Sequence, residues 1–195
     1  MIGREVLVGP DPSICKVKGV MFAARREFLI KDIGERTFYS VVSKLSPETM
    51  RIAMHPVADN WYDFAAVVEL DRAIWEACHK RYPYILELVG AASSELGITR
   101  VFQNLDAAEL FAFLERLAQF HKEYQKFGHL EAERTATGAR MHYRDYPCYS
   151  PVFCASGNGF LLEAIMRHGG QEADVVETRC HCRGDDVCTY EMTWR

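Results

Sequence analysis

The last quarter of the chain carries a set of thiols and a carboxylate whose spacing constrains the fold more than any other feature. Residues 177–188 read Glu-Thr-Arg-Cys-His-Cys-Arg-Gly-Asp-Asp-Val-Cys, so Glu177 and Cys180 precede a Gly-Asp turn and Cys188 follows it. Such a turn between two apolar runs predicts a β-hairpin that brings Cys188 back toward Cys180. With Cys154 upstream, these residues form a donor set that zinc accepts in tetrahedral sites. Buried cysteines that act only as small apolar side chains are the alternative.

Two further residues of this run are candidates for a place beside the donor set. If residues 173–181 form a strand, side chains alternate between its faces, so Cys180 and Cys182 share one face and His181 lies on the other. We therefore expect His181 at the surface and Cys182 as a free thiol near the metal. The sequence leaves open whether Cys182 or His181 replaces one of the four ligands.

Composition and charge indicate one packed domain and exclude several functions. The chain has 195 residues, 49% of them hydrophobic, and a formal net charge of −4. That length and composition suit a single core, and the charge gives no general attraction to nucleic acid. No secretory signal is visible at the N-terminus, and no apolar run has the ~20 residues needed to span a bilayer.

The seven cysteines, without an export signal, indicate a reducing compartment, so we expect a cytoplasmic protein whose clustered thiols bind metal. Cys15 and Cys78 have no partner pattern and are expected in the core. Cys148 is expected to be a core or pocket-lining thiol.

Hydrophobic periodicity predicts an α+β fold, with a helical N-terminal half packed on a C-terminal antiparallel sheet. An irregular lead-in over 1–16 precedes a single domain over 17–195, whose part from about 143 to 195 would bind zinc. A helix over 84–96 is expected to end at Gly97, and one over 106–127 to begin at Asp106 and end at Gly128. The remaining elements are expected as a strand or helix entry over 17–22, helices over 32–43, 63–81 and 149–166, a strand or hairpin over 131–143, and strands over 173–181 and 187–194.

The pattern of Cys154, Glu177-x-x-Cys180, Gly184-Asp185 and Cys188 resembles the four-vinyl-reductase (V4R) domain, the sensory module of phenol- and xylene-responsive activators. The resemblance covers about residues 143–194. It implies a structural zinc held by the four residues named above, beside a buried pocket for an aromatic ligand. It also implies a superfamily shared with the haem-nitric-oxide-binding sensors and the vesicle-tethering (TRAPP) subunits. The run over 17–22 is similar to an uncharacterised bacterial family of about this length.

Aromatic residues around the longest predicted helix suggest a small-molecule pocket, because ligand cavities are mainly apolar with a few polar groups. An ordinary core is the alternative. The candidate pocket residues are Phe113, Phe120, Tyr124, His142, Tyr149 and Phe153.

His121 near the end of that helix gives a second possibility. The haem-nitric-oxide sensors carry their proximal histidine on such a helix, so His121 would be the axial ligand of a haem. Their tyrosine-serine-arginine motif for the haem propionates is not reproduced in residues 141–146, Met-His-Tyr-Arg-Asp-Tyr. A hydrogen-bonded core histidine is the competing interpretation.

No phosphate loop or catalytic triad is recognisable, and a zinc with four protein ligands leaves no position for a reactive water. We therefore expect a non-enzymatic, zinc-stabilised sensing domain for a small hydrophobic or aromatic ligand. Because no effector segment follows the domain, the sensor would act through a protein partner or a homodimer. A haem gas sensor and an interaction scaffold without a small ligand are the alternatives.

Overall fold

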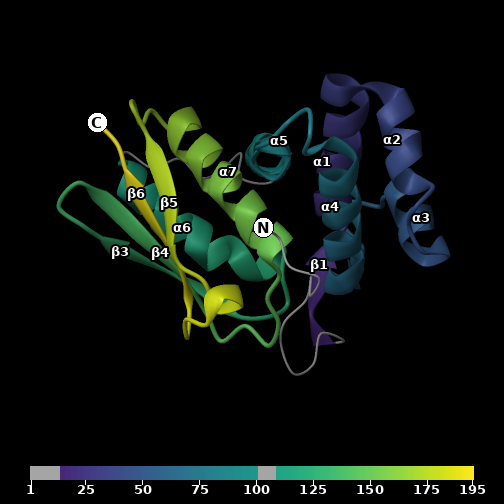
Figure 1. The fold of residues 1–195 in the computed structure, drawn as a ribbon. Coiled ribbons are helices and arrows are strands. Elements are labelled where there is room, and N and C mark those ends of the chain that lie inside the picture. Colours follow the sequence, from purple (N-terminus) through teal and green to yellow (C-terminus); the bar gives the residue numbers. More distant parts are fainter. Residues whose placement is uncertain (1–13, 101–108) are drawn as a thin grey trace.

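The computed structural model of the protein describes residues 14–100 and 109–195. Its helices and antiparallel sheet form two halves, which lie side by side in Figure 1. The helical half comes first in the chain and the sheet half second, so the expected α+β class is confirmed. None of the described helices combines the length and apolarity needed to cross a membrane.

The helical half contains five α-helices and a two-stranded antiparallel ribbon among the described residues. Its core includes the fully buried side chains of Phe22, Phe38 and Phe64. Ser46 caps the N-terminus of α3 (Pro47–Met54), since its hydroxyl accepts the Thr49 N–H. The elements are β1 (Lys16–Lys18), α1 (Val20–Phe28), a π-helical segment (Leu29–Gly34), α2 (Glu35–Val42), α3 (Pro47–Met54), β2 (Trp61–Asp63), α4 (Phe64–Cys78) and α5 (Ile85–Arg100).

The sheet half is a four-stranded antiparallel sheet in the order β3-β4-β6-β5. Met141, Tyr190 and Met192 of its inner face are buried in one core with residues of helices α6 and α7. Its outer face carries ion pairs such as Arg140–Glu191. The elements are α6 (Leu110–Phe120), a 3-10 turn (His121–Glu123), β3 (His129–Arg134), β4 (Gly138–Arg144), α7 (Pro151–Arg167), β5 (Asp174–Arg179), a 3-10 turn (His181–Arg183) and β6 (Cys188–Thr193).

Glycines allow α5 and α7 to pack closely where the two halves meet. A Cβ at Gly90 would lie 1.8 Å from the Ser156 carbonyl oxygen, and a Cβ at Gly159 would lie 1.8 Å from the Glu87 carbonyl oxygen. Only residues without side chains tolerate such an approach. The α5–α7 contact therefore fixes how the helical half sits on the sheet half, beside the site described below (Figure 1).

Two helix boundaries predicted from the sequence are wrong. Helix α5 continues past Gly97 to Arg100, and Gly97 lines a cavity instead of ending the helix. Helix α6 ends at Phe120. The following segment leaves the helix because Lys18 N–H donates to Tyr124 O and Lys126 N–H donates to Lys16 O, which ties it to β1.

The predicted N-cap, Asp106, lies outside the described residues. Gly128 does adopt a left-handed conformation, with φ +60°, but it follows an irregular segment and not the last turn of α6.

Two cysteines expected as separate core residues are joined. Cys15 and Cys148 form a disulfide that closes a sequence separation of 133 residues. It links the residue before β1 to the segment before α7, and so crosses between the two halves. Cys78 is a buried free thiol, as expected.

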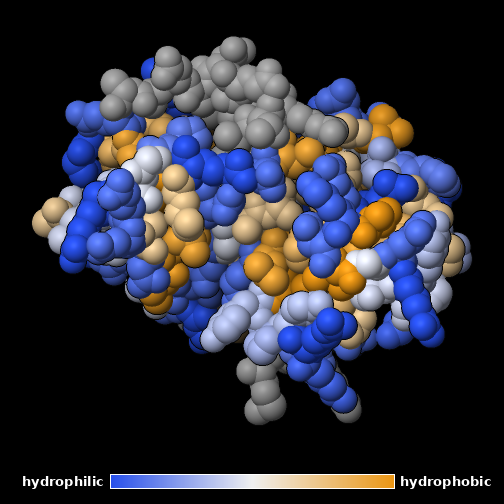
Figure 2. All heavy atoms as spheres, turned by 90° about the horizontal axis from the view of Figure 1, so that it is seen from above, coloured by the Kyte–Doolittle hydropathy of each residue, from blue (hydrophilic) through white to orange (hydrophobic). Residues whose placement is uncertain are grey.

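Exposed apolar side chains are spread over several elements. Figure 2 shows hydrophobic groups separated by hydrophilic residues on the upper face of the molecule. The large exposed apolar side chains on α5 and on the elements that follow it are Leu88, Phe120, Met166 and Val176.

Candidate functional site

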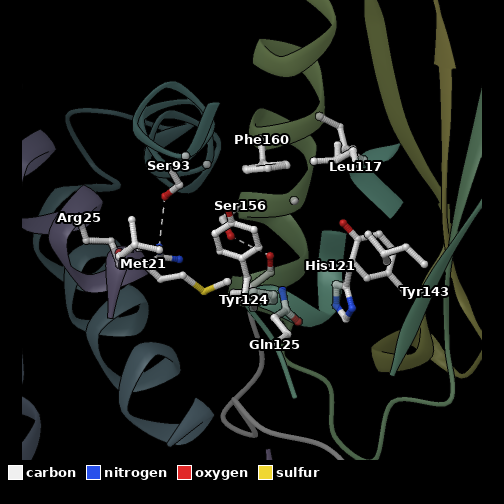
Figure 3. Close-up of a pocket in the computed structure, with 17 residues that line it drawn as sticks. Met21, Arg25, Ser93, Leu117, His121, Tyr124, Gln125, Tyr143, Ser156 and Phe160 are labelled. Atoms are coloured by element: carbon white, nitrogen blue, oxygen red, sulfur yellow. Dashed lines mark hydrogen bonds between the residues drawn. The ribbon is translucent and has the colours of Figure 1, made fainter. Parts of the chain in front are cut away.

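A cavity of about 100 Å³ lies where the helical half meets the sheet half. Residues of α1, α5, α6, α7, β3 and β4 surround it, and most of the surface they present is apolar (Figure 3). We call it the junction cavity. Its lining consists of Val20, Met21, Arg25, Gly90, Ser93, Gly97, Leu117, His121, Tyr124, Gln125, Leu130, Tyr143, Phe153, Ser156, Gly157, Phe160 and Leu161.

Arg25 is the single cation among the described lining residues, and it is already paired. Arg25 is 2% exposed, and its Nε and Nη2 donate to the two carboxylate oxygens of Asp71 at 2.6 and 2.8 Å. Its Nη1 donates to Met21 O and to Ser93 Oγ, a bond drawn in Figure 3. This bidentate pair joins α1 to α4 and leaves that end of the cavity close to neutral.

His121 supplies a neutral polar group at the other end of the junction cavity. It is 6% exposed, and its Nε2 lies 2.6 Å from the Tyr146 hydroxyl. Burial lowers the pKa of His121 to about 4, although its hydrogen bond to Gln125 raises it. The imidazole is therefore uncharged near pH 7, with Nε2 engaged by a tyrosine.

A second, smaller cavity of about 20 Å³ lies between the junction cavity and the cysteine cluster. Tyr143, Phe153 and Gly157 line both cavities and form the wall between them. The other residues around the smaller cavity are Phe64, Tyr146, Cys148, Tyr149, Ser150, Cys154, Cys188 and Tyr190.

The four expected metal ligands converge in the structure. One donor atom each from Cys154, Glu177, Cys180 and Cys188 lies within 4.8 Å of all the others. Cys188 Sγ is 3.9 Å from Cys154 Sγ and 4.0 Å from Cys180 Sγ. Thiolates bound tetrahedrally to zinc at ~2.3 Å lie roughly 3.8 Å apart. The cluster therefore has the donors and spacing of a tetrahedral zinc site.

The Gly-Asp turn shapes this cluster through two local contacts. Gly184 adopts φ +99°, which favours a residue without Cβ, and Asp185 Oδ2 accepts the Cys180 N–H at 2.7 Å. Tyr190, the third residue of β6, donates its hydroxyl to Cys154 O at 2.8 Å and ties β6 to α7. The hairpin and the start of α7 are thereby held against each other.

Electrostatics within the cluster favour a bound cation. Hydrogen bonds from the thiols of Cys154, Cys182 and Cys188 lower the pKa of Cys180 far below its usual range. Burial and the neighbouring Cys180 thiolate raise the pKa of Glu177 to about 7. Glu177 Oε2 accepts from Arg183, whereas its buried Oε1 has no partner. A metal ion held by the three thiols would also pair this carboxylate oxygen.

The neighbours of the cluster differ from the expectation based on strand alternation. Strand β5 ends at Arg179, and residues 181–183 form a 3-10 turn. The alternation of side chains between the two faces of a strand therefore does not extend to His181 and Cys182. His181 is half-buried, stacks on Tyr149 with ring centroids 4.2 Å apart, and donates its N–H to Cys188 Sγ. Cys182 lies beside the four donors as a half-buried free thiol.

The six candidate pocket residues fall in different places. Tyr124 and Phe153 line the junction cavity, and Tyr149 lines the smaller one. Phe113 is buried in the core, while Phe120 is 39% exposed. His142 lies on the outer face of the sheet, where it contacts Thr189 and Glu133.

Sequence reasoning missed the residues that join the halves around the cavity. Neither Arg25 nor the glycines Gly90 and Gly159 are among the residues that the sequence analysis singles out. The sequence holds two signals for these residues. One is a charged side chain among the apolar residues of a helical pattern, and the other is a glycine inside each of two helical patterns.

No family model matches the chain, and no curated protein sequence matches it. The chain is similar to solved structures of H-NOX domains. An H-NOX protein from S. oneidensis in the Fe(II)NO ligation state superposes with a TM-score of 0.71 at 14% identity, over 91% of this chain and 99% of that one. An unliganded Fe(II) H-NOX protein from K. algicida gives a TM-score of 0.67 at 10% identity, over 91% and 96%.

These neighbours bear on the two interpretations of the sequence differently. H-NOX domains belong to the superfamily that the V4R resemblance implied, but no comparison supports the V4R assignment itself. The haem-sensor alternative names the same class of protein as these neighbours, and the similarity to them is one of fold. Identity of 10–15% is evidence about architecture and not about ligand. The chain therefore has the fold of H-NOX domains.

Proposed function

We propose that this protein is a sensing domain that binds a small, uncharged, mainly apolar molecule in the junction cavity. The observation that carries the proposal is the position of this cavity. It is an apolar space at the contact of two halves, in a fold shared with H-NOX proteins. A ligand there touches both halves at once, so its binding can change how they pack.

The lining defines the class of ligand. Arg25 is neutralised by Asp71, and His121 is uncharged near pH 7 because burial lowers its pKa to about 4. A charged ligand would lose its hydration without gaining a free counter-charge among the described lining residues. The volume of about 100 Å³ is below the ~300–1,000 Å³ of drug-sized sites, which favours a ligand of few heavy atoms.

Zinc is the metal that the cysteine cluster fits. Cys154, Glu177, Cys180 and Cys188 would hold it, and the spacing of their donor atoms and the unpaired Glu177 Oε1 support this assignment. A zinc with four protein ligands stabilises structure and supplies no reactive water. Its role here is to clamp the β5–β6 hairpin to the start of α7, the helix that lines the junction cavity.

Haem is the second candidate, favoured by the fold and by the position of His121 on the cavity wall. The arrangement of the described residues does not fit it. Nε2 of His121 is hydrogen-bonded to Tyr146 at 2.6 Å, and the cavity is far smaller than a porphyrin requires. The guanidinium of Arg25, the one lining cation, is committed to Asp71.

Binding of toluene, followed by thermal unfolding, tests the main proposal. We expect toluene to raise the melting temperature of the protein, since a ligand that binds only the folded state stabilises it. Leu117→Phe fills the cavity and should abolish the shift, whereas Leu88→Phe, at an exposed position of α5, should retain it. Equal shifts in both variants would place toluene outside the junction cavity and contradict the proposal, and no shift in any protein would instead favour an interaction scaffold without a small ligand.

Haem titration separates the second candidate from the first. We expect no Soret band that depends on His121. A band that appears on reconstitution and is lost in His121→Ala would establish haem as the ligand. His79→Ala is the matched control, because His79 stacks on Trp75 in the helical half and does not line the cavity.

The output step would run through a protein partner or a second copy of the chain. Ligand entry between the halves is expected to shift a surface that such a partner contacts. Analytical ultracentrifugation together with pull-downs tests this part. A monomer that captures no partner would count against it.

A further inference from the structure

The junction cavity and the cysteine cluster are separated by a thin wall of side chains. Tyr143, Phe153 and Gly157 contact the junction cavity on one side and the smaller cavity on the other. The smaller cavity in turn borders Cys154 and Cys188. Two of the proposed metal ligands are therefore one layer of side chains away from the proposed ligand site.

A row of three stacked rings crosses this layer. The Tyr146 hydroxyl contacts His121 Nε2 at 2.6 Å, and the Tyr146 ring stacks on Tyr149 with centroids 5.5 Å apart. Tyr149 stacks on His181 with centroids 4.2 Å apart, and the His181 N–H donates to Cys188 Sγ at 3.3 Å. We call Tyr146, Tyr149 and His181 the aromatic row.

We propose that the aromatic row links the junction cavity to the metal centre, so that displacing Tyr146 from His121 weakens zinc binding. This inference rests on the proposed function, since it assumes a ligand in the cavity and zinc at the thiols. A ligand that hydrogen-bonds His121 competes with the Tyr146 hydroxyl for the same imidazole. By thermodynamic reciprocity, bound zinc then lowers the affinity of the cavity for that ligand by the same factor.

The packing around Tyr146 blocks its ring on one side and leaves space on another. On one side the ring lies against Gly128, where even a Cβ would approach Tyr146 Cδ2 to 2.1 Å, and against Phe127. On another side lies the smaller cavity of about 20 Å³. A ring released from His121 can therefore shift into the smaller cavity, toward Tyr149 and the thiols.

Zinc affinity, measured by chelator competition without any cavity ligand, tests the link. We expect His121→Ala to lower zinc affinity at least about fivefold, the lower end of typical coupling between sites. In a Tyr149→Leu background, where the row is broken, His121→Ala should leave zinc affinity unchanged. Tyr149→Phe keeps the ring and should preserve the effect. His79→Ala, outside both cavities, is the matched control.

A second readout does not require zinc affinity. The absorption spectrum of the Co²⁺-loaded protein reports the geometry of the thiolate ligands and should change in His121→Ala but not in His79→Ala. If Tyr149→Leu does not fold, as judged by circular dichroism, His181→Ala breaks the row at its other end.

Three results would overturn the inference. They are an effect of His121→Ala no larger than that of His79→Ala, an equal effect in the Tyr149→Leu or His181→Ala background, and a protein that binds no metal. Because these measurements use no cavity ligand, their failure leaves the toluene experiment untouched. Failure of toluene to bind likewise leaves the zinc measurements valid.

Discussion

The buried, neutral His121 predicts a specific dependence of stability on pH. Its pKa falls from the ordinary value of 6.5 to about 4 in the folded protein because burial disfavours the charged form. The unfolded chain therefore binds a proton at a higher pH than the folded chain does. The stabilisation is present above pH 6.5 and is lost as the pH falls from 6.5 toward 4.

The size of the effect follows from the same two pKa values. Lowering the pH from 7 to 5 protonates the unfolded histidine but hardly the folded one, which costs about 2 kcal/mol. The ceiling, reached below pH 4, is about 3 kcal/mol. His121 is 6% exposed, so solvent screening reduces these values little.

Urea unfolding of the wild type and His121→Gln at pH 7 and pH 5 measures this contribution. Glutamine keeps a hydrogen-bonding group opposite Tyr146 but does not titrate. We expect the wild type to lose about 2 kcal/mol more than the variant between the two pH values. The contributions of the other titrating groups to the free energy of unfolding are the same in both proteins and cancel in this difference. An equal loss in both proteins, or a larger loss in His121→Gln, would refute the buried, neutral state of His121.

Three further predictions concern the contacts that hold the site. Gly90→Ala should destabilise the protein by about 1–3 kcal/mol in thermal unfolding, because its Cβ would meet the Ser156 carbonyl at 1.8 Å; an unchanged melting temperature would contradict the close α5–α7 contact. Arg25→Met should cost about 3–5 kcal/mol by leaving Asp71 buried and unpaired, and Arg25→Met/Asp71→Leu should recover much of that loss; a double variant less stable than the single one would count against the pairing. Elemental analysis should find one zinc per chain in the wild type and much less in Cys180→Ser. A zinc content well below one equivalent in the wild type, unchanged in Cys180→Ser, would refute the proposed metal centre.

The sequence predicted the features that depend on neighbours along the chain. Glu177, Cys180 and Cys188 flank one turn, so their approach follows from local geometry. The strands of the sheet and helix α7 also follow from short periodic patterns. Cys154 could be named only as a long-range candidate, supported by the V4R resemblance, because nothing local relates it to the hairpin.

The junction cavity could not be predicted in the same way. Its polar ends depend on Arg25 meeting Asp71, 46 residues away, and on His121 meeting Tyr146, 25 residues away. The segment after Phe120 leaves its helical pattern because β1 pairs with it, an instance of tertiary contacts overriding local preference.

Ligand binding in the junction cavity is the central claim, and native mass spectrometry of protein purified from its own host tests it most directly. We expect the wild type and Leu88→Phe to release a small uncharged molecule when the complex is activated in the gas phase. Leu117→Phe, folded by circular dichroism but with its cavity filled, should carry none. A wild-type protein with no bound molecule, or the same molecule retained by Leu117→Phe, would contradict the account.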